Sequence, residues 1–321
     1  MSRYLLVSLI LGCSFAASAR ADAYPERPIR MLIPFAVGGS TDVAGRIVAQ
    51  GLTETLGRQV IVDNRTGAAG TIATEMAAKA TSDGYTVYLG SASTLAVNPA
   101  VFKRLSYDVL KDFELISLVA KGVHVLVINS AINANSVRDL IALAKKQSKK
   151  MTYASSGTGG VVHLAGEQFR LVAGLDLTHV PFKGGGPAAV ALLGGEIDMM
   201  VNDLAPVVAH MKAGRLRALA VADAKRSALV QDIPTFSEAG LPGVESASWA
   251  GLAAPLGTPK AVISRLSSDL SKIVASAEYR DRLAGAGMEP MSSTPQQFAA
   301  YMRLEMARWA KVAKAGNVQL N

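Results

Sequence analysis

The sequence predicts an α/β protein with two lobes, each a mainly parallel sheet flanked by helices, and a ligand cleft between the lobes. Three observations lead to this prediction. Short apolar runs rich in β-branched residues alternate with longer helical patterns, which is typical of parallel sheets. Glycine and hydroxyl residues follow several of these runs. No low-complexity linker divides the chain, so we expect short crossings between the lobes.

The first part of the chain predicts three strands with helices between them. The strands are expected at 29–34, 60–63 and 86–89. One helix is expected to open within the segment 38–42 and to run to about Leu56, and another to follow Gly67–Gly70 and run to Ala80. A glycine-rich segment precedes each helix, and Asp83-Gly84 is a turn signal before the third strand.

The middle of the chain repeats this alternation without repeating the sequence. Strands are expected at 123–128, 151–154, 177–180, 197–201 and 216–221. Ser136 is the expected N-cap of a helix at 137–146, and a second helix is expected to end near Ala173.

The pattern changes after Trp249. One helix is expected after Pro259 and another after Thr294-Pro295, with no strand between them. Consecutive helices of this kind are expected to pack onto a sheet that is already built, so we assign them to the first lobe. The predicted organisation is a signal peptide at 1–21, lobe 1 at 22–122 plus 249–321, and lobe 2 at 123–248.

Composition narrows the class of protein. The chain has 321 residues, of which 50% are hydrophobic, 18% charged and 6% aromatic. This excludes a disordered, collagen-like or disulfide-framework protein. The formal net charge is +8, but the basic residues are dispersed and aromatic residues are few. Nucleic-acid binding is therefore not expected.

The N-terminus has the pattern of a secretory signal peptide. Arg3 precedes an apolar run at 4–15, and small residues then lead to Ala19-Arg20-Ala21. The run is shorter than the roughly 20 residues that span a bilayer. We expect cleavage after Ala21, with Ala19 as the alternative. A lipoprotein-type site at Cys13 would leave a very short apolar region.

Cleavage after Ala21 changes the composition of the exported chain. Lys plus Arg falls from 33 to 31 against 25 acidic residues, which gives +6, and Cys13 is lost. The expected product is a periplasmic protein without cysteine. Thiol catalysis and Cys-ligated metals are thereby excluded.

Three segments place small or hydroxyl residues between a strand end and the start of a helix: 34–42, 89–94 and 154–160. A helix N-terminus carries free N–H groups and a partial positive charge, so it favours carboxylate or phosphate. In open α/β sheets such loops gather at the carboxyl ends of the strands. Together they predict an anion site, whereas any single one is also explained as a capped helix after a glycine turn.

Familiar catalytic motifs are absent from the sequence. There is no G-x-S-x-G elbow, no complete G-x-G-x-x-G and no Walker A sequence. The four histidines, at 124, 163, 179 and 210, have no metal-ligand spacing. We therefore expect no catalytic residue, metal or cofactor.

Four polar residues keep two interpretations each. His163 follows a glycine loop and either faces the cleft or is a structural hydrogen bonder. Lys183 either attracts an anion or is an exposed turn lysine. Asp42 and Asp203 either have a local structural role or meet an amine or hydroxyl of a ligand.

Ten segments, in this order, resemble the substrate-binding receptors of tripartite tricarboxylate transporters, often called the Bug family. They are Tyr24–Ile29, Pro34–Arg46, Val62–Thr74, Ser82–Thr86, Tyr107–Phe113, Ser155–Phe169, His179–Ala188, Leu192–Met200, Pro234–Gly243 and Ala254–Pro259. The resemblance covers essentially the whole mature chain. It implies a type II-like periplasmic binding fold that closes around a small carboxylate.

The resemblance also implies a set of ligand-binding residues. The first loop and the middle glycine-serine loop hold the carboxylate, an intervening strand-end loop adds hydroxyls, and the far wall adds polar side chains. These residues are Phe35, Ala36, Gly38, Gly39, Thr41, Asp42, Ser91, Ser93, Ser155, Gly157, Thr158, Lys183 and Asp203. His163 joins them as the candidate histidine described above.

This chain departs from the family at three positions. Ser40 stands where Pro or Gly is common, Gly160 where Ser or Thr is frequent, and Phe182 where Tyr is frequent. The last two changes remove hydroxyls near the expected pocket. They predict a less polar far wall, suited to an aromatic or alkyl-bearing carboxylate rather than citrate.

The predicted function is that of a monomeric, non-catalytic receptor. It is expected to capture a small organic carboxylate by cleft closure and to deliver it to inner-membrane permease subunits, or to act as a sensor. The alternative is a secreted hydrolase using Ser91, Ser93, Ser155 or Ser156 with His163. That alternative needs a base within about 3 Å of the hydroxyl and a third group that orients the base.

Overall fold

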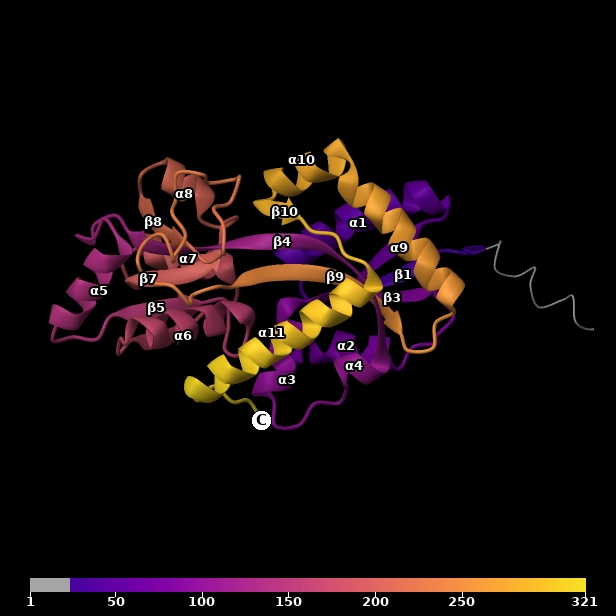
Figure 1. Cartoon of the computed structure of the whole chain (residues 1–321), viewed down its shortest axis with the longest axis horizontal. Coiled ribbons are helices and arrows are strands. Elements are labelled where there is room, and N and C mark those ends of the chain that lie inside the picture. The colour runs from indigo at the N-terminus through magenta and orange to yellow at the C-terminus, as the bar shows by residue number, and fades with distance from the viewer. Residues whose placement is uncertain (1–23) are drawn as a thin grey trace, which may run out of the picture.

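The computed structural model describes residues 24–321. The predicted signal peptide, with its cleavage after Ala21, lies outside these residues. The described chain forms two lobes joined by two long strands (Figure 1). Within 24–321, no helix combines the length and the apolar character that crossing a bilayer would require.

Lobe 1 is built from the first and last parts of the chain. Its first strands are β1 (Ile29–Ile33), β2 (Val60–Asn64) and β3 (Thr86–Ser91). Its first helices are α1 (Ser40–Leu56), η1 (Ala68–Gly70), α2 (Thr71–Ala78), η2 (Ala92–Val97), α3 (Asn98–Val101) and α4 (Val109–Asp112). Its C-terminal elements are α9 (Lys260–Ala275), α10 (Ala277–Gly285), β10 (Met288–Pro290) and α11 (Pro295–Ala315).

Lobe 2 is built from the middle of the chain. Its strands are β5 (Thr152–Ser155), β6 (Thr178–Pro181), β7 (Met199–Asp203) and β8 (Leu216–Val221). Its helices are α5 (Val137–Lys146), α6 (Val161–Ala173), α7 (Gly185–Leu193) and α8 (Val208–Lys212). The predicted bounds of α5 and β8 agree with the structure, and α1 begins within the predicted segment 38–42 and ends at the predicted Leu56, before Gly57 in a left-handed conformation.

Two strands run between the lobes: β4 (Phe113–Asn129) and β9 (Ala247–Pro255). The strand order is β2-β1-β3-β9-β4-β7-β5-β6, and β10 and β8 also pair with β4. The pairs among β1, β2 and β3 and among β5, β6 and β7 are parallel. Every pair that involves β4 or β9 is antiparallel. The two-lobed α/β fold is confirmed, but the sheets are mixed rather than mainly parallel.

The sequence prediction missed most of the crossing region. The expected strand at 123–128 is only the second half of β4, and β9 was not predicted. The C-terminal helices do return to lobe 1, but α10 and the short strand β10 lie between them. The proposed lobe boundaries, 122/123 and 248/249, fall inside β4 and β9.

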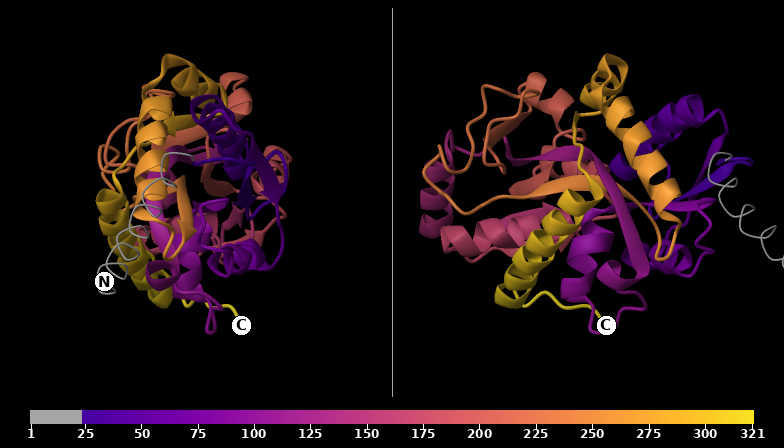
Figure 2. Two further views of the ribbon diagram at one scale, coloured as in Figure 1. Left: turned by 90° about the vertical axis from the view of Figure 1, so that its right-hand side faces the viewer. Right: turned by 45° about the vertical axis from the view of Figure 1, so that its right-hand side comes forward.

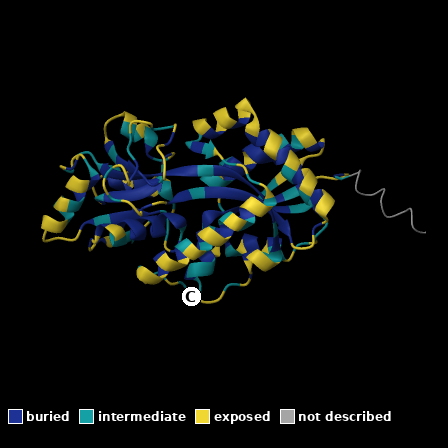
Figure 3. Cartoon of the chain, in the orientation of Figure 1, coloured by how far each residue is buried: buried dark blue, intermediate teal, exposed yellow. Residues whose placement is uncertain are grey.

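Each lobe buries apolar side chains on both faces of its sheet (Figure 3). In β1, Met31 and Ile33 pack toward α1 and α9, whereas Leu32 packs toward the η2 and α11 side. This alternation follows from the two-residue period of a strand. The face that carries Leu32 also holds Trp309, whose Nε1 donates to the buried Glu305 carboxylate at 3.2 Å.

The last helix extends from lobe 1 toward lobe 2. α11 begins with a capping box between Thr294 and Gln297 and has Pro295 in its first turn, which fixes its start. Its yellow ribbon passes beneath β9 and reaches α6 (Figures 1 and 2). The chain then pairs Leu320 with Phe102 of lobe 1. The C-terminus is therefore anchored close to the junction of the lobes.

Candidate functional site: a cleft between the lobes

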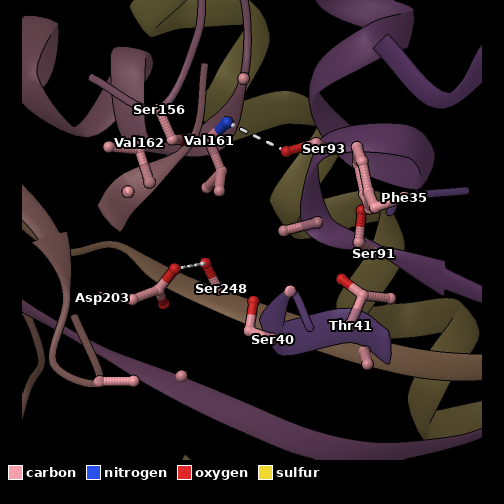
Figure 4. Close-up of a pocket in the computed structure, with 18 of the residues that line it drawn as sticks. Phe35, Ser40, Thr41, Ser91, Ser93, Ser156, Val161, Val162, Asp203 and Ser248 are labelled. Carbon is pink, nitrogen blue, oxygen red and sulfur yellow. Dashed lines mark hydrogen bonds between the residues drawn. The ribbon is translucent and has the colours of Figure 1, made fainter. Parts of the chain in front are cut away.

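A cleft of about 610 Å³ lies between the two lobes, within the usual range for small-molecule sites. Both lobes contribute to its walls, and apolar side chains such as Phe35, Trp249 and Met288 lie among hydroxyls and bare glycine backbone. Figure 4 shows Asp203 and Ser248 on one side of the open space and Phe35, Ser91 and Thr41 on the other. The enclosed space suits a small ligand rather than a polymer.

The lobe 1 wall contains the N-terminus of α1. Its N-cap is Gly39, which has no side chain to bond the first-turn N–H groups. Gly38, at φ +85°, adopts a left-handed conformation that glycine accepts readily. The helix start therefore faces the cleft with its backbone accessible to an anion.

Asp42 supports this loop from beneath. Its Oδ2 accepts from the Gly38 N–H at 2.9 Å and from Arg46 at 3.0 Å, and its Oδ1 accepts from Asn64 at 2.9 Å. Burial raises the pKa of this carboxyl, but the bonds from Arg46, Gly38 and Asn64 outweigh it and hold the pKa below its usual value. Its bonds are internal, so Asp42 shapes the loop rather than lining the cleft.

Lobe 2 contributes two more helix N-termini. The N-cap of α6 is Gly160 and that of α7 is Gly184, and neither provides a capping side chain. The Val161 N–H of α6 donates to Ser93 Oγ of lobe 1 at 3.2 Å, a hydrogen bond that joins the two lobes across the cleft. Three glycine-capped helix starts, from α1, α6 and α7, therefore line one cleft.

The segment after β3 is built differently. Ser91 caps η2 in a reciprocal box with Thr94, so its hydroxyl is already bonded within the segment. Ser91 and Ser93 do line the cleft. The third uncapped helix start expected at 89–94 lies instead at Gly184–Gly186.

The His163 cluster is a group of aromatic and polar residues that is buried beneath the α6 loop. It consists of Tyr153, Ser155, His163, Glu167, Arg170 and His179. The rings of His163 and His179 stack with centroids 3.7 Å apart. His163 Nδ1 accepts from the Gly159 N–H at 3.0 Å, and His179 Nε2 lies 2.7 Å from Ser155 Oγ. Burial, together with the neighbouring His179, lowers the pKa of His163 to about 4. Both rings hold the loop in place from below.

Glu167 completes the His163 cluster. This buried carboxylate accepts hydrogen bonds from Nε and Nη2 of Arg170, with Nε shared between its two oxygens, and a short one from the hydroxyl of Tyr153. Burial raises the pKa of Glu167, but the bonds from Arg170 and Tyr153 dominate and hold it below its usual value. The charge is neutralised within the cluster.

A second polar group, the Asp203 cluster, lies where β4, β7 and β9 meet. It consists of His124, Asp203, Ser246 and Ser248. The two ring nitrogens of His124 lie 2.9 Å from Ser246 Oγ and 3.0 Å from Ser248 Oγ. Ser248 Oγ donates to Asp203 Oδ2 at 3.2 Å. Unlike Glu167, Asp203 lines the cleft.

The structure brings most of the predicted ligand-binding residues together. Nine line the cleft: Phe35, Gly38, Gly39, Thr41, Ser91, Ser93, Gly157, Thr158 and Asp203. Five do not: Ala36, Asp42, Ser155, His163 and Lys183. Of these five, Asp42, Ser155 and His163 are buried supports, whereas Ala36 and Lys183 are exposed. Closeness in sequence to a glycine loop does not predict whether a side chain lines the cleft or is buried beneath the loop.

Several residues of the cleft were not predicted. They include Asn98, Asn202, Ser248, Trp249 and the backbone of Gly184–Gly186. Ser248 is the one polar residue of the otherwise apolar strand β9, and Asn202 directly precedes Asp203 at the end of β7, which are signals that could have marked them. Asn98 is fully buried, and its Nδ2 donates to Ala69 O at 3.1 Å.

The predicted hydrolase pairing is not formed. Ser155 contacts His179 rather than His163, and its side chain is fully buried beneath the loop. Ser93 Oγ is bonded to the Val161 N–H, and His163 to the Gly159 N–H. Among residues 24–321, no group of three or more His, Cys, Asp or Glu side chains is arranged to hold a metal ion.

The fold and the cleft define a solute-binding protein with two lobes. Comparisons with known proteins identify the family to which it belongs. A sequence profile described as the tripartite tricarboxylate transporter family receptor matches residues 44–318. Protein BugT of Bordetella pertussis is 36% identical over 323 residues, covering 100% of this chain and 99% of BugT.

Solved structures agree with the sequence match. A Rhodopseudomonas palustris protein with adipate superposes with a TM-score of 0.84 at 34% identity, covering 92% of this chain and 99% of that one. The periplasmic binding protein BugD gives 0.81 at 33% identity, covering 92% and 99%. MatC from Rhodopseudomonas palustris with bound malate gives 0.78 at 30% identity, covering 90% and 99%. The chain belongs to the tripartite tricarboxylate transporter receptor family, a family of periplasmic solute-binding receptors.

Proposed function

We propose that this protein captures a small organic carboxylate by closing its two lobes around it, and delivers it to a tripartite tricarboxylate-type permease of the inner membrane. The observation that carries the proposal is the convergence of three glycine-capped helix N-termini on one cleft. Free N–H groups and the positive end of the helix dipole favour a carboxylate at each.

Closure follows from where these helix starts lie. α1 belongs to lobe 1, whereas α6 and α7 belong to lobe 2, so one bound carboxylate can accept from both sides. A ligand with contacts to both lobes shifts the equilibrium toward the closed arrangement by its extra affinity for that arrangement. The Ser93–Val161 hydrogen bond supports a closed state in the same way.

The family and the cleft support different parts of the proposal. The carboxylate ligand is supported by the cleft and by relatives that bind adipate and malate. The permease is supported by the family description alone. We propose export by cleavage after Ala21 and a monomeric receptor, with a sensing role where a cell has no matching permease.

The test blocks the cleft by replacing one of the glycines that line it with a larger residue. Gly186 lines the cleft, and a Cβ built on it meets no atom within 4 Å, so Gly186→Leu has room for its first side-chain atom at the wall of the cleft. Gly285 also has no atom within 4 Å of a built Cβ and lies outside the cleft, so Gly285→Leu is the matched control.

The measurement is thermal unfolding with a panel of aliphatic, hydroxy, amino and aromatic carboxylates, because a ligand that binds only the native state raises the melting temperature. We expect at least one carboxylate to stabilise the wild type and Gly285→Leu, and to have no effect on Gly186→Leu. Stabilisation of all three proteins would place binding elsewhere, and stabilisation of none would overturn the receptor proposal.

A further inference from the structure

The charge distribution of the cleft is one-sided. Among the described residues that line it, Asp203 is the only charged side chain, and none is Lys, Arg or His. A carboxylate can therefore be bound only by backbone N–H groups, hydroxyls and amides. The one ionisable group that faces the ligand is itself an acid.

Asp203 is held in position rather than left mobile. Ser248 Oγ donates to its Oδ2, and His124 in turn holds Ser248. Oδ1 is buried beside Gly122, where a built Cβ would lie only 2.5 Å away, so the missing side chain at 122 makes room for the carboxylate. The carboxylate is packed against β4 and has one defined orientation.

The acceptor capacity of Asp203 is not filled by the protein. Oδ1 has no hydrogen-bond donor among the described residues, and His124 Nε2 lies 3.5 Å from it. Oδ2 has one donor, Ser248, and an ionised carboxylate oxygen accepts more than one. Because Oδ1 is buried, Oδ2 is the oxygen that remains for a ligand.

A second acceptor lies beside Asp203. Asn202 lines the cleft and is almost fully buried, at 1% exposure. Its Nδ2 donates to Gly185 O at 3.4 Å, and its Oδ1 has no donor among the described residues. Asn202 Oδ1 is as buried as Asp203 Oδ1, so Asp203 Oδ2 is the acceptor that the end of β7 offers to a ligand, whereas the helix starts offer donors.

We propose that the ligand carries an ammonium group in addition to its carboxylate, with the carboxylate at the glycine-capped helix starts and the ammonium on Asp203. This assignment rests on the proposed function and names the ligand class of the same cleft: amino acids in the broad chemical sense. An ammonium forms a charge-assisted hydrogen bond with Asp203. A second carboxylate would face a like charge and would have to share a proton with it.

The test compares ligands of one chain length that differ in the presence and position of an amino group or of a second carboxylate. One set is hexanoate, 2-aminohexanoate, 6-aminohexanoate and adipate, and the four- and five-carbon sets vary the length. Titration calorimetry of the wild type is expected to show at least one amino compound binding tenfold or more tightly than the plain acid and the diacid of its set.

Two variants assign this preference to a residue. Asp203→Asn keeps the shape but removes the charge, and we expect it to lose at least tenfold in affinity for the amino compound while the diacid binds as well or better. Asp232→Asn removes an exposed acid of the same lobe outside the cleft, and we expect it to behave as the wild type.

The outcomes separate this inference from the proposed function. If the wild type prefers a plain acid or a diacid, the ammonium assignment fails while the carboxylate receptor stands. If the amino preference survives in Asp203→Asn, the assignment to Asp203 fails. If no compound of any set binds, the ammonium assignment fails, and the wider carboxylate panel decides the receptor proposal separately. The wild-type ranking is decisive even if Asp203→Asn does not fold.

Discussion

The His163 cluster and the Asp203 cluster use the same residue types to different ends. Each combines histidine, serine and one carboxylate. In the His163 cluster, Arg170 and the Tyr153 hydroxyl satisfy Glu167, and the group is buried beneath a loop. In the Asp203 cluster, the carboxylate lines the cleft and keeps acceptor capacity. Composition therefore does not separate a scaffold from a binding site, whereas the balance of donors and acceptors does.

The largest expected effect is on the free energy of unfolding, and it comes from replacing the carboxylate of each cluster in turn. Glu167→Gln removes a buried charge that pairs with Arg170, and we expect it to lower the free energy of unfolding by about 3 kcal/mol. Asp203→Asn keeps the Ser248 bond and is expected to lower it by less than about 1 kcal/mol. Urea unfolding measures both, and equal losses would contradict the division into scaffold and site.

A smaller effect is expected from pH, through His163 and its neighbour His179, because burial lowers the pKa of both imidazoles. The pKa of His163 is about 4 in the folded protein and near 6.5 in the unfolded chain, so between these values the unfolded state binds the extra proton. Stability is unaffected above about pH 6.5 and falls as the pH drops toward 4, by about 2 to 3 kcal/mol. Unfolding free energies measured across this range test the sign.

His163→Gln provides the control for that titration. It removes the imidazole and keeps a side-chain acceptor for the Gly159 N–H. We expect a weaker dependence of stability on pH between 6.5 and 4. Glu167, whose pKa is lowered, loses its stabilising charge only at more acidic pH and so does not produce this slope. An unchanged slope would assign the effect to another group.

The smallest expected effect is on ligand affinity. It concerns the loop that separates the His163 cluster from the cleft. Ser93→Ala removes the hydroxyl that accepts from Val161 across the lobes. A neutral hydrogen bond contributes about 1 kcal/mol, so we expect a three- to fivefold loss of ligand affinity. Calorimetry with the tightest carboxylate measures it. Ser106→Ala, on the surface outside the cleft, should leave the affinity unchanged, and a loss there would contradict the prediction.

Local signals predicted much of the fold. Ser136 and the caps around α1 gave helix bounds that agree with the structure, because capping is decided by a few neighbouring residues. The first half of β4 and all of β9 were missed. Their partners lie more than a hundred residues away, so no local pattern records the pairing. Tertiary contacts, rather than the local sequence, decide whether a strand joins a parallel sheet in the antiparallel direction.

The sequence predicted which loops form the walls of the candidate site, but it did not predict which side chains beside these loops line the cleft. The glycine loops at 34–42 and 154–160 do form walls of the cleft. Ser155 and His163 flank the second loop but are buried below it, because their packing against His179 and Gly159 is set by the tertiary structure. Asp203 was named with two interpretations, and the packing at Gly122 and Ser248 is what distinguishes it.

The position of β9 in the sheet has a kinetic consequence. The lobe 1 order runs β3-β9-β4, so residues 247–255 insert between strands that precede them in the chain. Lobe 1 has no continuous sheet until most of the polypeptide is available, and its contacts span long loops that close slowly. We therefore expect folding to be late and cooperative across both lobes, with lobe 2 and the C-terminal part of lobe 1 needed before the lobe 1 sheet is complete.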